Sequence, residues 1–246
     1  MERRRASRGQ ITLARALSKF GLASRTGAAL LIREGRVSVN GRTVTLATAW
    51  IDPRADRIAV DGAPLRPAPF RTMMMHKPAG VVTSMADERG RRTVADLLPP
   101  DASGLFPVGR LDRDTTGLLL FTNDTRLGDY LTDPDSHVPK TYEVTLDAPL
   151  SAAARVALEG GLAGPDGTVY RPCVVRPGDD PASWIMTIDE GKNRQIRRMA
   201  GALGYSVVRL HRCAIGPLTL GSLAAGAVRA LSAEEVDALK SELKGT

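Results

Sequence analysis

Residues 108–124, VGRLDRDTTGLLLFTND, join a charged turn to an apolar run and then to a second polar turn. Arg110, Asp112 and Asp114 alternate along the first half of this stretch. They precede residues 118–121, an apolar run that is typical of a buried strand. A carboxylate at the end of a buried strand is costly to desolvate, so it either pairs with a cation or stays in water. The rest of the chain decides between these alternatives.

Length and composition are those of a globular protein with an aliphatic core. Of the 246 residues, 43% are hydrophobic and 4% are aromatic, which suits one large domain or a small and a medium one. Residues 1–10, MERRRASRGQ, are basic and lack the apolar stretch of a secretory signal. No later apolar run reaches the roughly 18 residues of a spanning helix. We therefore expect a soluble, cytoplasmic protein with no membrane contact and a flexible basic tail over residues 1–10.

The cysteines and histidines do not indicate a metal site. Cys173 and Cys213 stand far apart in the sequence, and the three histidines show no ligand spacing. We expect two buried, reduced thiols and no bound metal.

Positive charge is concentrated at the N-terminus. Residues 1–70 contain 13 Lys or Arg against 5 Asp or Glu, a net charge of +8, whereas residues 71–246 carry a net charge of −1. This asymmetry is typical of an electrostatic handle for nucleic acid. A role in solubility is the alternative explanation, but it does not predict the asymmetry.

The N-terminal quarter predicts two short helices followed by a hairpin. Apolar residues at helical spacing over residues 13–20 stop at Gly21, and Ser24 is suited to cap a second helix that ends near Gly35. Alternation around Asn40-Gly41 predicts a type I′ hairpin, and a further strand turns at Asp61-Gly62. A stiff linker then marks a domain boundary near residue 68; its prolines are Pro64, Pro67 and Pro69.

Residues 13–44, LARALSKFGLASRTGAALLIREGRVSVNGRTV, resemble the small alpha-L RNA-binding domain of ribosomal small-subunit protein S-four and tyrosyl-tRNA synthetases. The resemblance implies such a domain over residues 11–67, with arginines that contact phosphates and position RNA without reading its sequence. The candidates are Arg25, Arg33, Arg36 and Arg42. Alternatively, each of them is a plain solvated charge.

Beyond the linker, periodicity predicts a mixture of strands and helices. Strands are expected at residues 72–76, 81–84, 118–121, 140–146, 171–176, 184–189 and 207–210, and helical segments at residues 93–98, 126–131, 151–160, 193–203 and 232 onwards. The irregular alternation with hairpin-like connections predicts an α+β domain on a mixed, largely antiparallel sheet flanked by helices.

A basic helix is predicted near residue 195. Residues 192–212 contain six Lys or Arg and no Asp or Glu. Asn193 is a plausible N-cap, and Arg194, Arg197 and Arg198 lie opposite the apolar face. Cations without acids at a helix N-terminus favour anions such as phosphates. An ordinary basic helix is the weaker alternative.

Four segments match one family in order. They are HKPAG (residues 76–80), GRLDRDTTGLLLFTND (109–124), KTYEV (140–144) and EGKNRQIRRM (190–199). These segments resemble the RsuA/RluB family of ribosomal RNA pseudouridine synthases, which usually carry an N-terminal alpha-L domain as well. The resemblance covers nearly the whole chain and implies a pseudouridine synthase domain over residues 68–246. Two departures, His76 before Lys-Pro and Thr125 after Thr-Asn-Asp, bear on loop shape and target choice.

The resemblance also implies roles for individual residues. Asp112 corresponds to the catalytic aspartate, Tyr142 to the tyrosine that stacks on the target base, and Arg197 to the basic partner of the aspartate. A nearby cation keeps a carboxylate ionised, and the planar fork of arginine suits that task. Asp112 can then act as a nucleophile or as a base. Further candidate RNA contacts are Lys77, Arg110, Lys192, Arg194 and Arg198.

The implied reaction converts one uridine in ribosomal RNA to pseudouridine after base flipping, without a metal or an organic cofactor. Large-subunit (23S) rRNA is favoured because Gly-Lys-Asn-Arg followed by Ile-Arg-Arg is closer to RluB-like than to RsuA-like members; 16S rRNA is the alternative. The substrate is either free rRNA or a ribosome assembly intermediate, and we expect a monomer. A non-catalytic rRNA-binding or assembly factor is the competing hypothesis, but it would not need Asp112, Tyr142 and Arg197 together.

Overall fold

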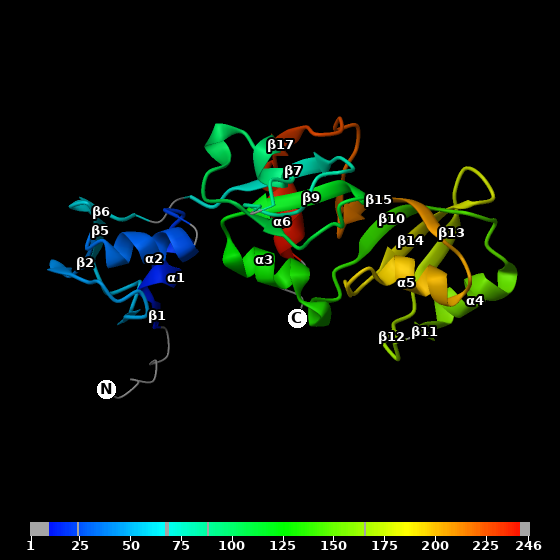
Figure 1. The fold of residues 1–246 in the computed structure, drawn as a ribbon, viewed down its shortest axis with the longest axis horizontal. Coiled ribbons are helices and arrows are strands. Elements are labelled where there is room, and N and C mark those ends of the chain that lie inside the picture. The colour runs from blue at the N-terminus through cyan, green and yellow to red at the C-terminus, as the bar shows by residue number, and fades with distance from the viewer. Residues whose placement is uncertain (1–9, 24, 67–68, 88, 165, 242–246) are drawn as a thin grey trace. The chain divides into compact units, whose positions relative to one another are not determined.

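The computed structural model describes residues 10–23, 25–66, 69–87, 89–164 and 166–241. The chain divides into two compact units, each of which is considered by itself (Figure 1). Unit 1 comprises Met1–Arg71, Pro100–Leu105 and Asn123–Thr125, and unit 2 comprises Thr72–Pro99, Phe106–Thr122 and Arg126–Thr246. Residues 1–9 of the predicted basic tail, the predicted cap residue Ser24 and residues 67–68 of the predicted linker lie outside the described part of the chain.

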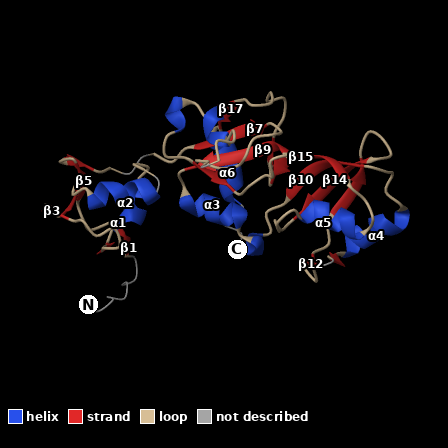
Figure 2. Cartoon of the chain, viewed as in Figure 1, coloured by secondary structure: helices blue, strands red, loops and turns tan. Residues whose placement is uncertain are grey.

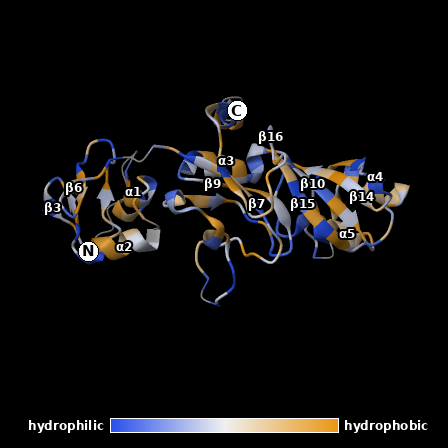
Figure 3. Ribbon diagram, turned by 90° about the horizontal axis from the view of Figure 1, so that it is seen from above, coloured by the Kyte–Doolittle hydropathy of each residue, from blue (hydrophilic) through white to orange (hydrophobic). Residues whose placement is uncertain are grey.

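Unit 1 combines two helices with short antiparallel strands. The helices are α1 (Leu13–Lys19) and α2 (Arg25–Arg33), and the strands are β1 (Ile11–Thr12), β2 (Val37–Val39), β3 (Arg42–Thr43), β4 (Trp50–Ile51), β5 (Ile58–Val60) and β6 (Ala63–Pro64). Strand order is β3-β2-β5-β6, with β1 and β4 as a separate pair. Leu13, Leu17, Ala28 and Ile32 are buried together under the sheet residue Val37. Apolar segments are visible on α1 and α2 in Figure 3.

The turns of unit 1 agree with the sequence predictions. Asn40 and Gly41 have φ angles of 52° and 78°, as a type I′ hairpin turn requires, and β2 pairs with β3 around them. Asp61 and Gly62, at 49° and 79°, turn β5 into β6 in the same way. Gly21, at 76°, follows the end of α1, where a residue without Cβ adopts the left-handed region at little cost.

A mixed sheet forms the centre of unit 2 (Figure 2). Its main strand order within the described residues is β13-β14-β10-β15-β9-β7-β17, and only the β15–β9 pairing is parallel. The strands of this sheet are β7 (Thr72–Lys77), β8 (Phe106–Val108), β9 (Thr116–Thr122), β10 (Lys140–Leu146), β13 (Val174–Pro177), β14 (Ser183–Ile188), β15 (Val207–Ile215), β16 (Leu218–Thr219) and β17 (Val228–Ala230). The strands β11 (Leu162–Ala163) and β12 (Val169–Tyr170) form a separate pair. This confirms the predicted α+β class with a largely antiparallel sheet.

Helices and short 3-10 turns connect the strands. The helices are α3 (Thr125–Thr132), α4 (Ala152–Gly160), α5 (Gln195–Ala202) and α6 (Ala233–Ser241), and the 3-10 turns are Val94–Leu97, Pro100–Ala102 and Pro134–Ser136. Ser151 caps α4 by accepting a hydrogen bond from the amide of Ala154 at 3.1 Å, as predicted. The predicted capping box before α6 is also present, because Ser232 and Glu235 exchange side-chain-to-backbone hydrogen bonds.

The stretch at residues 108–124 forms the central part of this sheet. Residues 118–121 of β9 have no exposed surface, because β7 pairs with them on one side, β8 pairs with residues 120–122 on the other, and apolar side chains cover the strand. Gly117 allows the parallel pairing, since a Cβ there would lie 2.2 Å from the carbonyl oxygen of Arg212. The charged turn at residues 109–115 is thereby fixed at the start of a rigid strand.

Three of the sequence predictions for unit 2 are wrong in detail. Residues 81–84 form only the isolated bridge between Val82 and Thr93, because the chain turns away after β7. The strand expected at residues 171–176 starts at Val174. Asn193 does not cap α5; Arg194 occupies the N-cap position, without a side-chain cap hydrogen bond.

In the described part of the chain, no helix is long and apolar enough to span a membrane.

Candidate active site

A cavity of about 400 Å³ opens beside the charged turn of unit 2. It is lined by residues 108–112 of the turn, Lys140 and Tyr142 of β10, residues 191–196 before and within α5, and Leu210, Arg212 and Ile215 of β15. Its size suits one small molecule or one flipped nucleoside. Three of the four segments that stand out in the sequence therefore meet at this cavity.

Asp112 lies in the turn between β8 and β9, and its side chain is partly exposed. Its Oδ2 accepts a hydrogen bond from Nη1 of Arg194 at 3.2 Å. Nε of Arg197 is 4.0 Å from the same oxygen, which is an ion-pair distance and longer than a hydrogen bond. Two guanidinium groups thus face one carboxylate, and the shorter contact comes from Arg194 rather than from Arg197.

Arg197 is held in place by a second contact. Its Nη1 donates to the carbonyl oxygen of Val207 at 2.9 Å, while its buried Nε has no hydrogen-bond partner in the described structure. The guanidinium is thereby anchored at one end, and its remaining donor lies next to Asp112. Arg197 does not line the cavity, and its Nε is placed to donate to a slightly shifted carboxylate of Asp112.

The loop that presents Arg194 is organised by the buried carboxylate of Glu190. Glu190 accepts hydrogen bonds from Nε2 of Gln195 at 2.7 Å and from the amide of Arg171 at 3.0 Å. Nζ of Lys192 lies 2.8 Å from its other oxygen. Burial raises the pKa of Glu190, but the hydrogen bonds from Lys192, Arg171 and Gln195 outweigh it and hold the pKa below its usual value.

This network explains the unusual backbone of Arg194. Its φ and ψ of 52° and 34° lie in the left-handed region, which a residue with Cβ adopts only at some cost. The amide of Lys192 donates to Oε1 of Gln195 at 3.1 Å, so the loop closes on the first residue of α5. The side chain of Gln195, rather than that of Asn193, stabilises this helix start.

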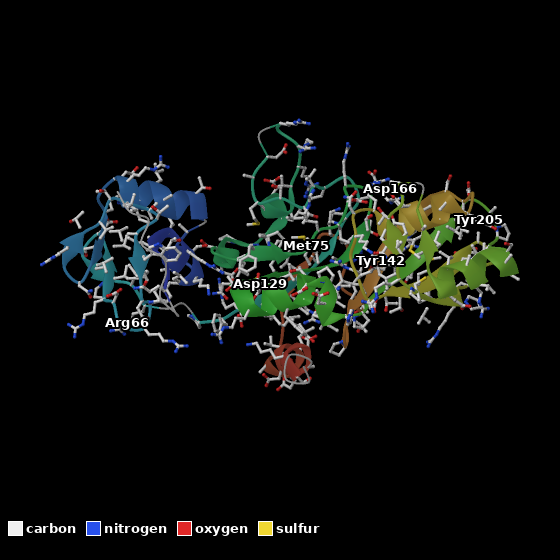
Figure 4. All side chains as sticks on the ribbon, turned by 90° about the horizontal axis from the view of Figure 1, so that it is seen from below. Arg66, Met75, Asp129, Tyr142, Asp166 and Tyr205 are labelled. Carbon is white, nitrogen blue, oxygen red and sulfur yellow. The ribbon has the colours of Figure 1, made fainter. Side chains whose placement is uncertain are left out.

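Tyr142 lies on β10 at the centre of the sheet, where it is labelled in Figure 4. Its side chain lines the cavity and is 9% exposed. It is opposite Met186 of β14 and Arg212 of β15. An aromatic ring that forms part of a cavity wall can stack on a base that enters.

Two further cations line the cavity, and neither is among the residues that the sequence assigned to the site. Lys140 is 8% exposed and Arg212 is 5% exposed. A signal for Lys140 was available, because it stands two residues before Tyr142 on a strand and therefore shares its face. Arg212 could not be found in this way, because a bulge between β10 and β15 decides which residue opposes Tyr142.

Lys77 corrects one sequence prediction, because it does not lie where RNA could reach it. Its side chain is fully buried, and Nζ donates to the carbonyl oxygens of Pro78, Arg113 and Thr115 at 3.0, 3.2 and 2.9 Å. All three donors of the ammonium are thus used within the fold. Lys77 holds the charged turn against β7 and is removed from the candidate RNA contacts.

The other candidate RNA contacts fall into two groups. Arg110, Lys192 and Arg194 are exposed and line the cavity. Arg198 lies on the exposed side of α5 and pairs with Asp166 at 2.5 Å, outside the cavity lining. Among the described residues, no group of three or more His, Cys, Asp or Glu could hold a metal ion.

The candidates of unit 1 differ in how free their side chains are. Arg36 makes two hydrogen bonds to Asp61, at 2.9 and 2.7 Å, whereas Arg42 is exposed on β3. Nε of Arg33 donates to the carbonyl oxygen of Ala29 at 3.3 Å. The side chain of Arg25 lies outside the described part of the chain.

Two family models match this chain. Residues 71–202 match the model of the RNA pseudouridylate synthases, and residues 12–48 match the S4 domain. The first of these matches spans the turn with Asp112, the strand with Tyr142 and the helix with Arg197.

Relatives and a solved structure resemble the chain over most of its length. An uncharacterised RNA pseudouridine synthase of Mycobacterium tuberculosis is 37% identical, covering 97% of this chain and 96% of its own. The ribosomal large subunit pseudouridine synthase B of Bacillus subtilis is 33% identical, covering 93% and 95%. The ribosomal small subunit pseudouridine synthase A of Escherichia coli is 38% identical, covering 87% and 93%.

A crystal structure of a pseudouridylate synthase superposes with a TM-score of 0.69 at 32% identity, covering 93% of this chain and 99% of the other. Sequence and fold thus agree over both the N-terminal region and the region that holds the cavity. The chain belongs to the RNA pseudouridylate synthase family and carries an N-terminal S4 domain.

Proposed function

We propose that the protein converts a uridine of ribosomal RNA to pseudouridine, with Asp112 as the catalytic carboxylate. The observation that carries the proposal is the carboxylate of Asp112 beside two arginines at a cavity that also contains Tyr142. A carboxylate at such a cavity can act as a nucleophile or as a base. One relative is named after the large ribosomal subunit and another after the small one, which supports rRNA as the substrate class.

The mechanism begins with extrusion of the target nucleotide, since the cavity is too small for a base-paired stretch. Extrusion costs a few kcal/mol, which stacking on Tyr142 at roughly 1 to 3 kcal/mol and phosphate contacts at the rim offset. Arg110, Lys192 and Arg194 are exposed at the cavity and suited to those phosphates. Asp112 is then beside the sugar of the flipped nucleotide.

In the chemical step, the bond between N1 and C1′ breaks, the base turns, and a bond forms between C5 and C1′. Asp112 either attacks C1′ or removes the 2′ proton to give a glycal. In both routes Arg194 and Arg197 set the position of the carboxylate. Because Arg197 is fixed at Val207, it also limits how far Asp112 can move during the reaction.

For the target we favour 23S rRNA on the motif at residues 190–199, with 16S rRNA as the alternative. The relatives named after both subunits do not select between the two. We further propose that residues 11–67 form the RNA-binding domain and residues 68–246 the catalytic domain, and that the protein acts as a monomer. The cytoplasmic location expected from the sequence is likewise a prediction.

Pseudouridine mapping tests the proposal directly. Purified protein is incubated separately with protein-free 23S rRNA, protein-free 16S rRNA, assembly intermediates and intact ribosomal subunits, all from cells that lack the corresponding gene. Carbodiimide-based mapping is expected to show one new pseudouridine in 23S rRNA. A new site in 16S rRNA alone would reverse the target assignment, and no new site on any substrate would favour the non-catalytic binding factor.

A further inference from the structure

Two buried cations at the inner part of the cavity have no carboxylate partner of their own. Lys140 and Arg212 are both more than nine-tenths buried, whereas the side chain of Asp112 is about one-third exposed. Nε of Arg212 donates to the carbonyl oxygen of Leu118 at 2.8 Å, but its buried Nη2 has no partner. Among the described residues, neither Lys140 nor Arg212 makes an ion pair.

The register of the sheet places these cations beside Tyr142. Lys140 and Tyr142 are two residues apart on β10 and share one face, and Arg212 of β15 is directly opposite Tyr142. Asp189, the residue directly after β14, is the acidic side chain whose charge reaches Lys140, but it is already paired with Arg171 at 3.4 Å. The cavity therefore contains an aromatic wall with two donor groups next to it.

Such an arrangement is costly for the empty protein. Burial and the positive charge of Arg212 lower the pKa of Lys140 and the charge of Asp189 only partly opposes them, so that the pKa is about 8. Unpaired buried cations destabilise a fold unless a partner compensates. Buried donors without partners at a cavity indicate a ligand that brings the acceptors.

We propose that Lys140 and Arg212 are the receptor for the uracil ring of the flipped nucleotide. They donate hydrogen bonds to its carbonyl oxygens and stabilise the ring while it is detached from the sugar. When the N1–C1′ bond breaks, its electron pair stays on the ring, and the negative charge spreads over N1 and the carbonyl oxygens. The charge is removed when the ring bonds through C5 to C1′ and the C5 proton is lost while N1 gains one.

This role differs from that of the cations at the rim. Arg110, Lys192 and Arg194 are exposed, as groups that contact a solvated phosphate must be, while Lys140 and Arg212 are reached only from within the cavity. Ammonium and guanidinium groups are donors only, so they match the O4 acceptor of uracil and oppose the N4 amino group of cytosine. The pair therefore also explains selection of uridine over cytidine.

The proposal rests on the proposed function, and single-turnover kinetics separate the two. On the rRNA that the wild type modifies, Lys140→Met is expected to lower the rate at saturating enzyme by about 100-fold, because one preorganised donor to a developing charge is lost. Its RNA affinity should stay within about threefold of wild type, and its thermal unfolding temperature should not fall. Lys240→Met on α6, outside the cavity lining, is the matched control with wild-type rate.

Two further measurements exclude a merely structural role for these residues. Arg212→Gln keeps a donor for Leu118 but removes the charge, and it should show a similar loss of rate. With 5-fluorouridine at the target position, the base is a better leaving group, so the deficit of Lys140→Met in cleaving N1–C1′ should shrink. Wild-type rates in both variants would overturn the proposal that Lys140 and Arg212 bind the uracil ring, while leaving the proposed function intact. An inactive wild type on every rRNA substrate would overturn both.

Discussion

Two lysines of the same sheet are buried to a similar degree but differ in whether the protein supplies hydrogen-bond acceptors for them. Lys77 at the end of β7 gives all three of its protons to backbone carbonyl oxygens. Lys140 at the start of β10 has no hydrogen-bond partner among the described residues and lines the cavity instead. Lys77 therefore serves the architecture of the charged turn, whereas Lys140 is available to a ligand.

Burial alone does not distinguish a structural cation from a functional one. The deciding observation is whether the protein itself supplies the acceptors. Lys77 and Lys140 both belong to segments that resemble the family, HKPAG and KTYEV, so sequence similarity does not separate the two roles either. Measurements of stability separate them more sharply.

The largest effect on stability is expected for Lys77→Met. The carbonyl groups of Pro78, Arg113 and Thr115 lose their donor, at about 1 to 3 kcal/mol each, and the relieved desolvation of the ammonium offsets part of this. We expect the free energy of unfolding to fall by roughly 4 kcal/mol in urea titrations. An unchanged midpoint would mean that the carbonyl groups find other partners and that Lys77 is not architectural.

The pH dependence of stability should show the effect of the lowered pKa of Lys140. Its pKa of about 8 lies below the usual 10.5, so between these values the unfolded chain holds a proton that the native protein has lost. Stability then rises with pH, by at most about 1.4 kcal/mol per pH unit. The stability advantage of Lys140→Met over wild type should be largest below pH 8 and shrink by up to about 3 kcal/mol towards pH 10.5.

A stability difference between Lys140→Met and wild type that stays constant from pH 7 to pH 10.5 would contradict the unpaired state of Lys140.

Much of this fold follows from the sequence, because its turns and caps are local. Gly21, Asn40-Gly41 and the capping box at Ser232 require only residues that are close in the chain. The turn of Asp112 and the central strand at residues 118–121 follow from periodicity for the same reason.

Non-local contacts explain what the sequence could not give. The start of α5 depends on Gln195 and Glu190, whose carboxylate is buried by segments elsewhere in the chain. The roles of Lys77 and Arg212 depend on which strands become neighbours and on a bulge between them. The burial of Lys77 and Arg212 therefore could not be predicted from the sequence.

The smallest effects are expected on RNA binding, for substitutions of exposed arginines in unit 1. These arginines differ in their ion pairs and not in burial. Arg42→Ala should weaken RNA binding and reduce the slope of log affinity against log salt by about 1, as for one lost phosphate contact. Arg36→Ala should change the slope less, because Asp61 and Glu34 already neutralise this side chain. Filter binding at several salt concentrations measures both, and a larger change for Arg36 would reverse this ranking.

The catalytic role of Asp112 is tested most directly by comparing pseudouridine formation by wild-type protein and Asp112→Asn on the same rRNA. Asparagine keeps the size of the side chain but removes its charge and nucleophilicity. We expect the wild type to modify one uridine and the variant to form no detectable pseudouridine, with an unchanged fold. RNA affinity should be retained, because Arg194 and Arg197 lose an anionic partner and become available to phosphate. Substantial pseudouridine formation by purified Asp112→Asn would contradict the central role assigned to this carboxylate.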